Sequence, residues 1–163
     1  MSQIVLVAVF VLLVISLALS HAEVTPSKQC KGQNIDNLQD RVEVLPCGAS
    51  SCQLKKGTDI TVNFRFKPEK EVLDLRNNVY ARTGWFGLTL PFVGVNGASA
   101  CENIRTLDGA AADCPLAPHI EYLYSNKFHV EWYYPSMSLT VHWALNDGET
   151  DVICFEVHAS ISS

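Results

Sequence analysis

The segment 60–66 decides the fold, and it reads Ile-Thr-Val-Asn-Phe-Arg-Phe. Apolar side chains occupy every second position, which is the pattern of a β-strand with one buried face and one wet face. The same alternation returns at 139–145 and 153–157, and segments 79–92 and 120–130 are rich in β-branched and aromatic residues. Turn signals lie between them, at Lys56-Gly57, Asn77-Asn78, Asn96-Gly97, Asp108-Gly109 and Asn146-Asp147-Gly148. Six or seven short strands are therefore predicted to pack as an all-β sandwich.

The amino terminus carries a different kind of segment. Residues 4–19 are almost entirely apolar and are followed by Ser20-His21-Ala22. A short apolar run that ends in small residues is typical of a secretory signal peptide, and it is too short to cross a bilayer comfortably. We therefore expect residues 1–22 to be a signal peptide and residues 23–163 to form one domain.

The charge balance narrows the range of partners. The chain has 12 Lys and Arg against 17 Asp and Glu, a formal net charge of −5. An acidic surface disfavours nucleic acid and anionic membrane surfaces as partners. The sequence calls for no cofactor and no metal.

All six cysteines lie after the predicted signal peptide. In an oxidising compartment an even number of cysteines indicates disulfides rather than metal ligands or a catalytic thiol. Four residues separate Cys47 from Cys52 and twelve separate Cys101 from Cys114, so both pairs close short loops at low entropic cost. Cys30 would then pair with Cys154 and tie the two ends of the domain together.

The strands carry unusually bulky residues for their inner faces. The candidates are Phe64, Phe66, Trp85, Phe86, Phe92, Tyr122, Tyr124, Tyr134, Trp143 and Phe155. Aromatic side chains suit both a dry core and an apolar cavity that holds a ligand. Composition alone leaves both interpretations open.

An enzyme is not indicated. The histidines His119, His129, His142 and His158 lie on different segments, and the chain has no Gly-x-Ser-x-Gly elbow and no His-Glu-x-x-His motif. His142 falls on the polar side of its predicted strand, so we expect a solvated side chain there.

Several motifs resemble the ML-domain lipid-recognition family, including its sterol-binding and arthropod members. They are Cys114-Pro115-Leu116, the segment 122–127, Tyr134-Pro135-Ser136, Val141-His142-Trp143 and Cys154-Phe155-Glu156. The resemblance implies an immunoglobulin-like sandwich of two antiparallel sheets, splayed apart to form an internal apolar cavity for a sterol or an acyl chain. It also implies the same three disulfides.

The resemblance further implies which residues bind the ligand. It places Phe92, Val130 and Tyr134 at the mouth of the pocket, and Leu90, Tyr124, Trp143, Phe64 and Phe66 are expected in its walls. His129 stands where the sterol-binding members have Pro, and Phe155 where they have Trp. Lys127 and His129 flank the strand that leads to Val130, so we expect them to offer donors to a carboxylate at the mouth. The cavity is then expected to accept fatty acids at least as well as sterols.

The function expected from the sequence is a secreted carrier of a fatty acid, a sterol or a semiochemical. No Asn-x-Ser/Thr acceptor for a sorting glycan is present, which favours extracellular fluid over the lysosome. We expect a monomer that contacts a membrane or a receptor while it transfers its ligand. The alternative is a cell-surface or immune accessory module that presents lipid or has a dry core. An antibody-type domain would place a Trp soon after its first core cysteine, and none lies between Cys30 and Cys52.

Overall fold

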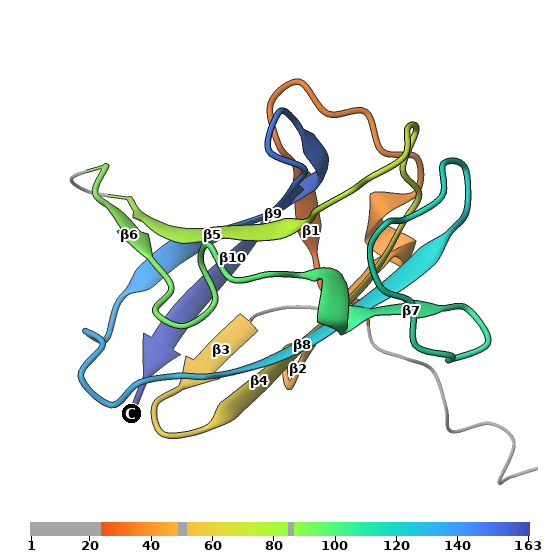
Figure 1. The fold of residues 1–163 in the computed structure, drawn as a ribbon. Coiled ribbons are helices and arrows are strands. Elements are labelled where there is room, and N and C mark those ends of the chain that lie inside the picture. The colour runs from red at the N-terminus through yellow and green to blue at the C-terminus, as the bar shows by residue number, and fades with distance from the viewer. Residues whose placement is uncertain (1–23, 49–51, 85–86) are drawn as a thin grey trace, which may run out of the picture.

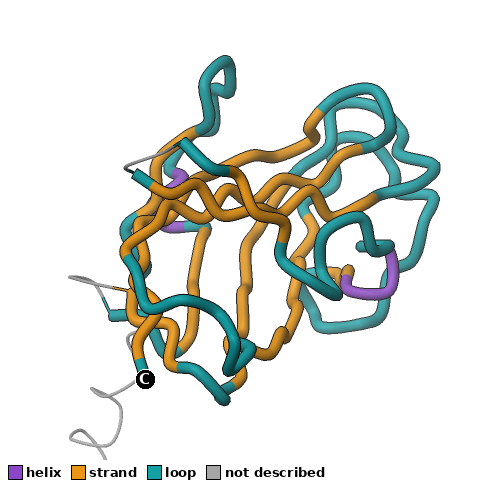
Figure 2. Tube along the Cα trace, turned by 90° about the vertical axis from the view of Figure 1, so that its left-hand side faces the viewer, coloured by secondary structure: helices purple, strands orange, loops and turns teal. Residues whose placement is uncertain are grey.

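The computed structural model describes residues 24–48, 52–84 and 87–163, which fold into two layers of β-strands (Figures 1 and 2). The predicted signal peptide and the aromatic candidates Trp85 and Phe86 lie outside the described residues. No helix among the described residues is long and apolar enough to cross a membrane.

One layer is a six-stranded sheet and the other a four-stranded sheet. The larger sheet contains β1 (Ser27–Gln29), β3 (Cys52–Lys55), β5 (Arg76–Thr83), β6 (Thr89–Pro91), β9 (Ser138–Asn146) and β10 (Asp151–Ser162). The smaller sheet contains β2 (Val42–Leu45), β4 (Asp59–Phe66), β7 (Ile104–Thr106) and β8 (Tyr122–His129). Two short 3-10 helices, η1 (Leu38–Asp40) and η2 (Cys101–Asn103), lie in the connections.

The sheets are antiparallel with one exception among the described strands. The larger sheet runs in the order β1-β10-β9-β5-β6, and the smaller one runs β2-β4-β8-β7. β3 pairs in parallel with the last residues of β10. β1 pairs in antiparallel fashion with an earlier part of the same strand. The predicted two-sheet sandwich is confirmed, with more and shorter strands than the alternation indicated.

The alternating segments form the central strands as predicted. In β4 the side chains of Ile60, Val62, Phe64 and Phe66 are buried, because this face of the strand packs against the opposite sheet. Segment 79–92 contributes to two strands, β5 and β6, which pair with each other. The turn predicted at Asn77-Asn78 is wrong, because both residues lie inside β5.

The core between the sheets is aromatic at its centre. The ring of Phe64 on β4 stacks on Tyr124 of β8 at a centroid distance of 4.5 Å. It also meets Phe155 of β10 edge to face at 5.1 Å, so side chains of both sheets interlock.

Three disulfides fasten this frame, with the pairing expected from loop closure. Cys30–Cys154 joins the end of β1 to β10 and closes a separation of 124 residues. Cys47–Cys52 links the chain just after β2 to the start of β3, and so connects the two sheets. Cys101–Cys114 spans 13 residues beside β7.

The expectation of a solvated His142 is wrong. His142 is only 8% exposed, although its side chain points to the outer face of β9. The Cys30–Cys154 disulfide and the ring of Tyr80 cover this part of the outer face.

Candidate functional site

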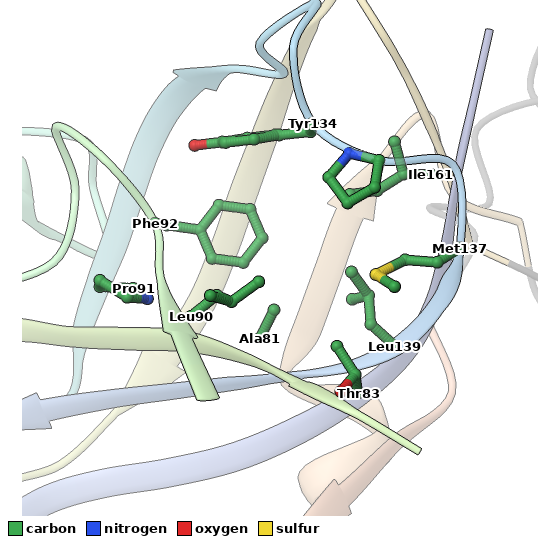
Figure 3. Close-up of a pocket in the computed structure, with 10 residues that line it drawn as sticks. Ala81, Thr83, Leu90, Pro91, Phe92, Tyr134, Met137, Leu139 and Ile161 are labelled. Atoms are coloured by element: carbon green, nitrogen blue, oxygen red, sulfur yellow. The ribbon is translucent and has the colours of Figure 1, made fainter. Parts of the chain in front are cut away.

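An apolar pocket lies at the end of the sandwich where β5 and β10 finish and β9 begins (Figure 3). Its volume is about 50 Å³. The lining residues carry no charge, and they are Ala81, Thr83, Leu90, Pro91, Phe92, Tyr134, Pro135, Met137, Leu139 and Ile161. This composition suits a hydrocarbon ligand.

The pocket is closed on one side by two aromatic rings. Phe92 follows β6 and is held in place by its N–H, which donates to the carbonyl of Val79 at 3.1 Å. Its ring meets Tyr134 edge to face at 6.1 Å and Phe128 at 5.4 Å. Figure 3 shows Phe92 and Tyr134 facing Met137 and Leu139 across the pocket.

The connection between β8 and β9 positions Tyr134. A turn forms where the N–H of Tyr134 donates to the carbonyl of Glu131 at 3.2 Å. The loop is fastened to β10 because the N–H of Ile161 donates to the carbonyl of Met137 at 2.9 Å. Burial raises the pKa of the Tyr134 phenol despite an opposing hydrogen bond with the backbone of Val93. The hydroxyl therefore stays neutral.

A second, smaller void lies between the sheets. Its volume is about 20 Å³, and its lining is Val44, Cys52, Leu54, Val62, Phe128, Val141, Trp143, Phe155 and Val157. The Phe128 ring packs on Trp143 at 6.0 Å as well as on Phe92. A continuous row of aromatic rings thus leads from the outer pocket to the inner void.

The residues that resemblance placed in the site divide into three groups. Phe92, Tyr134 and Leu90 line the outer pocket, and Trp143 lines the inner void. Phe64, Phe66 and Tyr124 lie in the core and line neither cavity. Val130, expected at the mouth, lines neither cavity: it is fully buried just after β8, where its N–H donates to the carbonyl of Thr58 and its carbonyl accepts from the N–H of Gly57.

The structure does not bring Lys127 and His129 to the pocket. Both alternate with the inward-facing Phe128 and Val130, so they lie on the outer face of the smaller sheet. Their side-chain nitrogens each contact a carboxylate oxygen of Asp59 at 2.8 Å. These hydrogen bonds, the one from Lys127 first, lower the pKa of Asp59.

Further residues at the cavities were not identified from the sequence as ligand-binding residues, among them Ala81, Met137, Leu139, Ile161 and Phe128. Leu139 belongs to an alternating segment, so the sequence predicts that its side chain points inward. Met137 lies in a loop without periodicity, so the sequence does not predict its position.

A buried polar network adjoins the aromatic core. The hydroxyl of Tyr124 donates to Oδ1 of Asn77 at 2.6 Å and accepts from Nδ2 of Asn126 at 2.8 Å. Nδ2 of Asn77 in turn donates to the carbonyl of Ala98 at 3.3 Å. Burial raises the pKa of Tyr124 far above its ordinary value, so the phenol remains neutral. The network joins β8 of one sheet to β5 of the other.

The fold and the pocket define the class of this protein as an immunoglobulin-like β-sandwich that opens at one end to an apolar pocket. The chain belongs to the ML domain family, whose family model matches residues 24–161. It is 29% identical over 157 residues to the mouse protein "NPC intracellular cholesterol transporter 2", and the match covers 96% of this chain and 97% of the relative.

Two further relatives agree. The Drosophila melanogaster protein "NPC intracellular cholesterol transporter 2 homolog a" is 28% identical over 124 residues, covering 74% of this chain and 78% of the relative. A solved structure, a Niemann-Pick type C2 protein from Japanese carpenter ant, superposes with a TM-score of 0.62 at 19% identity. It covers 88% of this chain and 100% of its own and supports the fold.

Proposed function

We propose that this chain binds one lipid molecule between its two sheets and carries it through an extracellular fluid. The observation that carries the proposal is the uncharged pocket framed by Phe92, Tyr134 and Met137. Membership of the ML domain family supports a lipid ligand, and the mouse relative is named as a cholesterol transporter. The protein acts by binding rather than by catalysis.

Loading requires the pocket to expand. A volume of about 50 Å³ is well below the roughly 300 Å³ at which ligand pockets begin. Phe92 and Phe128 separate the outer pocket from the inner void, and both are side chains that can rotate without breaking a hydrogen bond. An incoming lipid displaces these two rings and joins the cavities, with Trp143 at the inner end.

The chemistry of the mouth limits how a polar head group is held. Thr83 and Tyr134 are the lining residues that carry a side-chain hydroxyl, and the Tyr134 hydroxyl bonds with the backbone of Val93. A sterol hydroxyl can bond to Thr83, whereas a fatty acid carboxylate keeps its charge in water at the rim. Each methylene buried contributes about 0.8 kcal/mol, so a long acyl chain gains enough to bind without an ion pair. We therefore retain fatty acids as ligands at least as favourable as sterols.

Ligand transfer needs contact with the membrane or receptor that supplies the lipid. Trp132 and Tyr133 precede Tyr134 and are exposed, with Trp132 at 77%. Trp and Tyr bind well at interfaces that are apolar on one side and wet on the other. In a transfer assay from donor vesicles, Trp132→Ser should slow lipid uptake severalfold. The control Leu73→Ser, at an equally exposed residue beyond the opposite end of β5, should not.

Two measurements test the proposal. Mass spectrometry of organic extracts from the purified protein should show about one lipid per chain, and an empty protein would favour the interaction module with a dry core. Competition of oleate and cholesterol against a fluorescent lipid probe then ranks the ligands, and displacement by cholesterol alone would overturn the fatty acid hypothesis.

A pocket-filling variant locates the site. Ala81→Leu adds about three carbon atoms to the pocket wall and should abolish probe binding, at a cost in stability of about 1 kcal/mol. Thr61→Leu places the same leucine side chain on the outer face of β4 and should bind the probe normally. Undiminished binding by Ala81→Leu would show that the lipid lies elsewhere.

A further inference from the structure

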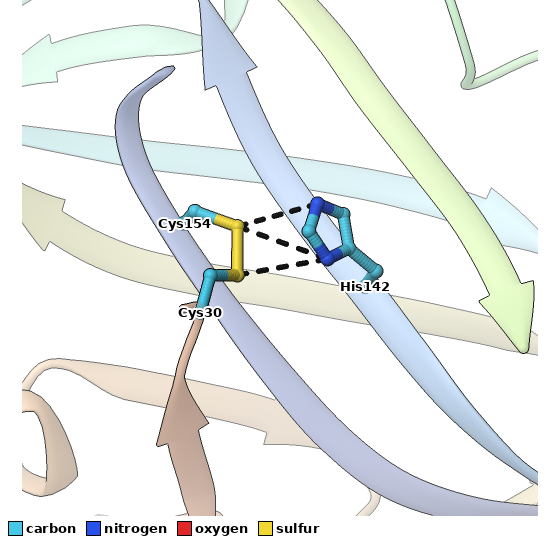
Figure 4. A group of neighbouring side chains, drawn as sticks. All are labelled: Cys30, His142 and Cys154. Atoms are coloured by element: carbon cyan, nitrogen blue, oxygen red, sulfur yellow. Dashed lines mark hydrogen bonds between the residues drawn. A yellow bond between two sulfur atoms is a disulfide. The ribbon is translucent and has the colours of Figure 1, made fainter. Parts of the chain in front are cut away.

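The Cys30–Cys154 disulfide has a histidine packed directly against both of its sulfur atoms (Figure 4). Nε2 of His142 lies 3.3 Å from Sγ of Cys154, and Nδ1 lies 3.6 Å from Sγ of Cys30. The ring stacks on Tyr80 at a centroid distance of 4.3 Å, which fixes its plane. Nδ1 is also 3.4 Å from the carboxylate of Glu156, which is itself paired with Arg82. The imidazole is thus held with one edge toward the sulfurs.

This setting differs from that of the Cys101–Cys114 disulfide. There the sulfurs lie near carboxylates: Asp113 is clustered with both cysteines, and Oδ1 of Asp74 is 3.9 Å from Sγ of Cys101. A carboxylate repels an attacking thiolate and disfavours a departing one, whereas an imidazolium does the reverse. The exposed Lys31, which follows Cys30 in the chain, adds a further positive charge close to that cysteine.

We propose that Cys30–Cys154 is a thiol-exchange site, at which His142 acts as the proton donor to the departing sulfur. The nucleophile is the thiolate of a small dithiol. It attacks Sγ of Cys30, which is 9% exposed, rather than Cys154, which is 1% exposed. A bond forms between the dithiol sulfur and Cys30, and the bond between Cys30 and Cys154 breaks.

The departing electron pair stays on Sγ of Cys154, which takes the proton from Nε2 of the His142 imidazolium. The second thiol of the reductant then loses its proton and attacks its own sulfur in the mixed disulfide. This step releases Cys30 as a thiolate that is protonated by water. The dithiol leaves oxidised as a cyclic disulfide, and the protein has gained two electrons and two protons.

The exchange has a structural consequence at a distance from the sulfur atoms. Reduction removes the covalent link between β1 and β10, so β1 is then held on β10 by hydrogen bonds and packing alone. β10 continues from Cys154 to Ile161, which lines the apolar pocket. A thiol-rich compartment would therefore loosen β1 at one end of the strand whose other end forms one wall of the pocket.

Partial reduction with dithiothreitol between pH 5 and 8 tests the proposal. Free cysteines are trapped in acid with N-ethylmaleimide and located by peptide mass spectrometry. We expect Cys30 and Cys154 to be labelled before Cys101 and Cys114 in the wild-type protein. The rate divided by the thiolate concentration should fall as pH rises through the range in which imidazoles lose their proton.

The matched variants are His142→Gln and His158→Gln, the latter at an exposed histidine on β10. His142→Gln should slow reduction of Cys30–Cys154 about tenfold and flatten its pH profile, because an adjacent imidazolium lowers a thiol pKa by about two units and exchange rates follow with a Brønsted slope near 0.5. His158→Gln should change neither. Reduction that is equally fast or faster in His142→Gln, with an unchanged pH profile, overturns the proposal, as does earlier reduction of Cys101–Cys114 in the wild type. The order of reduction and the wild-type profile need no substitution, so they decide the matter even if His142→Gln fails to fold.

Discussion

The substitution Phe92→Ala distinguishes between the hypothesis of a lipid pocket and that of a dry core. Phe92 is 5% exposed and makes edge-to-face contacts with Phe128 and Tyr134. Loss of a buried Phe ring costs roughly 3–5 kcal/mol. The ring already borders an open pocket, so fewer contacts are lost than in a closed core. We expect the ligand-free variant to be less stable than the wild type by about 3 kcal/mol.

The same substitution enlarges the cavity that a lipid would fill. Lipid at 100 times its dissociation constant stabilises a protein by about 2.7 kcal/mol, and tighter binding at the same concentration stabilises it more. Urea unfolding of delipidated protein, with and without oleate or cholesterol, measures both effects. We expect lipid to stabilise Phe92→Ala more than the wild type, and the surface control Leu73→Ala to behave as the wild type does. If lipid stabilises neither protein, the reasoning is refuted and the core is dry.

The remaining predictions concern stability. Tyr124→Phe removes a buried hydroxyl that makes two hydrogen bonds and should cost about 2 kcal/mol in urea unfolding at an unchanged m-value. A loss below about 0.5 kcal/mol would show that the network is not formed. Asp147 accepts hydrogen bonds from the backbone of Thr150 and Glu149 and pairs with Lys70, which together lower its pKa from 3.8 to about 2. A lowered folded-state pKa stabilises the protein above about pH 4, and this contribution is lost as the pH falls through about 2. The free energy of unfolding of Asp147→Asn should therefore depend less on pH across that window than that of the wild type. In the chain-entropy model, removing Cys30–Cys154, which closes 124 residues, should cost about 5 kcal/mol, whereas removing Cys47–Cys52, which closes 5, should cost about 2 kcal/mol. Thermal unfolding of the paired Cys→Ala variants measures both losses, and the reverse ranking would contradict loop entropy as the cause.

The central strands could be predicted because their alternation reflects burial on one face. β4, β9 and most of β10 follow this rule. Asn77 misled the prediction because Asn-Asn usually marks a turn, and the preference is overridden here by partners supplied from distant loops and from Tyr124. β1, β3, β6 and β7 have three or four residues each, too few for a period to show.

The site was predictable only in part, for a similar reason. Phe92 and Tyr134 could be placed through their motifs, whereas Lys127 and His129 were assigned a role at the mouth from nearness along the chain. Alternation puts them on the opposite face from Val130, where both contact Asp59. His142 was expected to be solvated because it lies on the polar side of its strand. It is instead covered by the Cys30–Cys154 disulfide, and Cys30 lies 112 residues away in the sequence.

Of the three disulfides, Cys47–Cys52 is the one that bridges the two sheets, and it lies along the β2–β3 edge. On the opposite edge the sheets meet through aromatic contacts and the Tyr124 hydrogen bonds. Two sheets that are crosslinked along one edge separate by rotation about that edge, and the gap between them grows in proportion to the distance from the crosslink. β8 lies two strands from β2, about 10 Å, so a rotation of about 10° would open roughly 1.7 Å there while the crosslinked edge stays closed. Once an incoming lipid has displaced the Phe92 and Phe128 rings, such a change of angle would let the proposed cavity take ligands of different thickness, with loss of the Tyr124–Asn77 hydrogen bond between β8 and β5. Substitutions along β6 and the β8–β9 loop would retune the preferred ligand without disturbing the crosslinked edge.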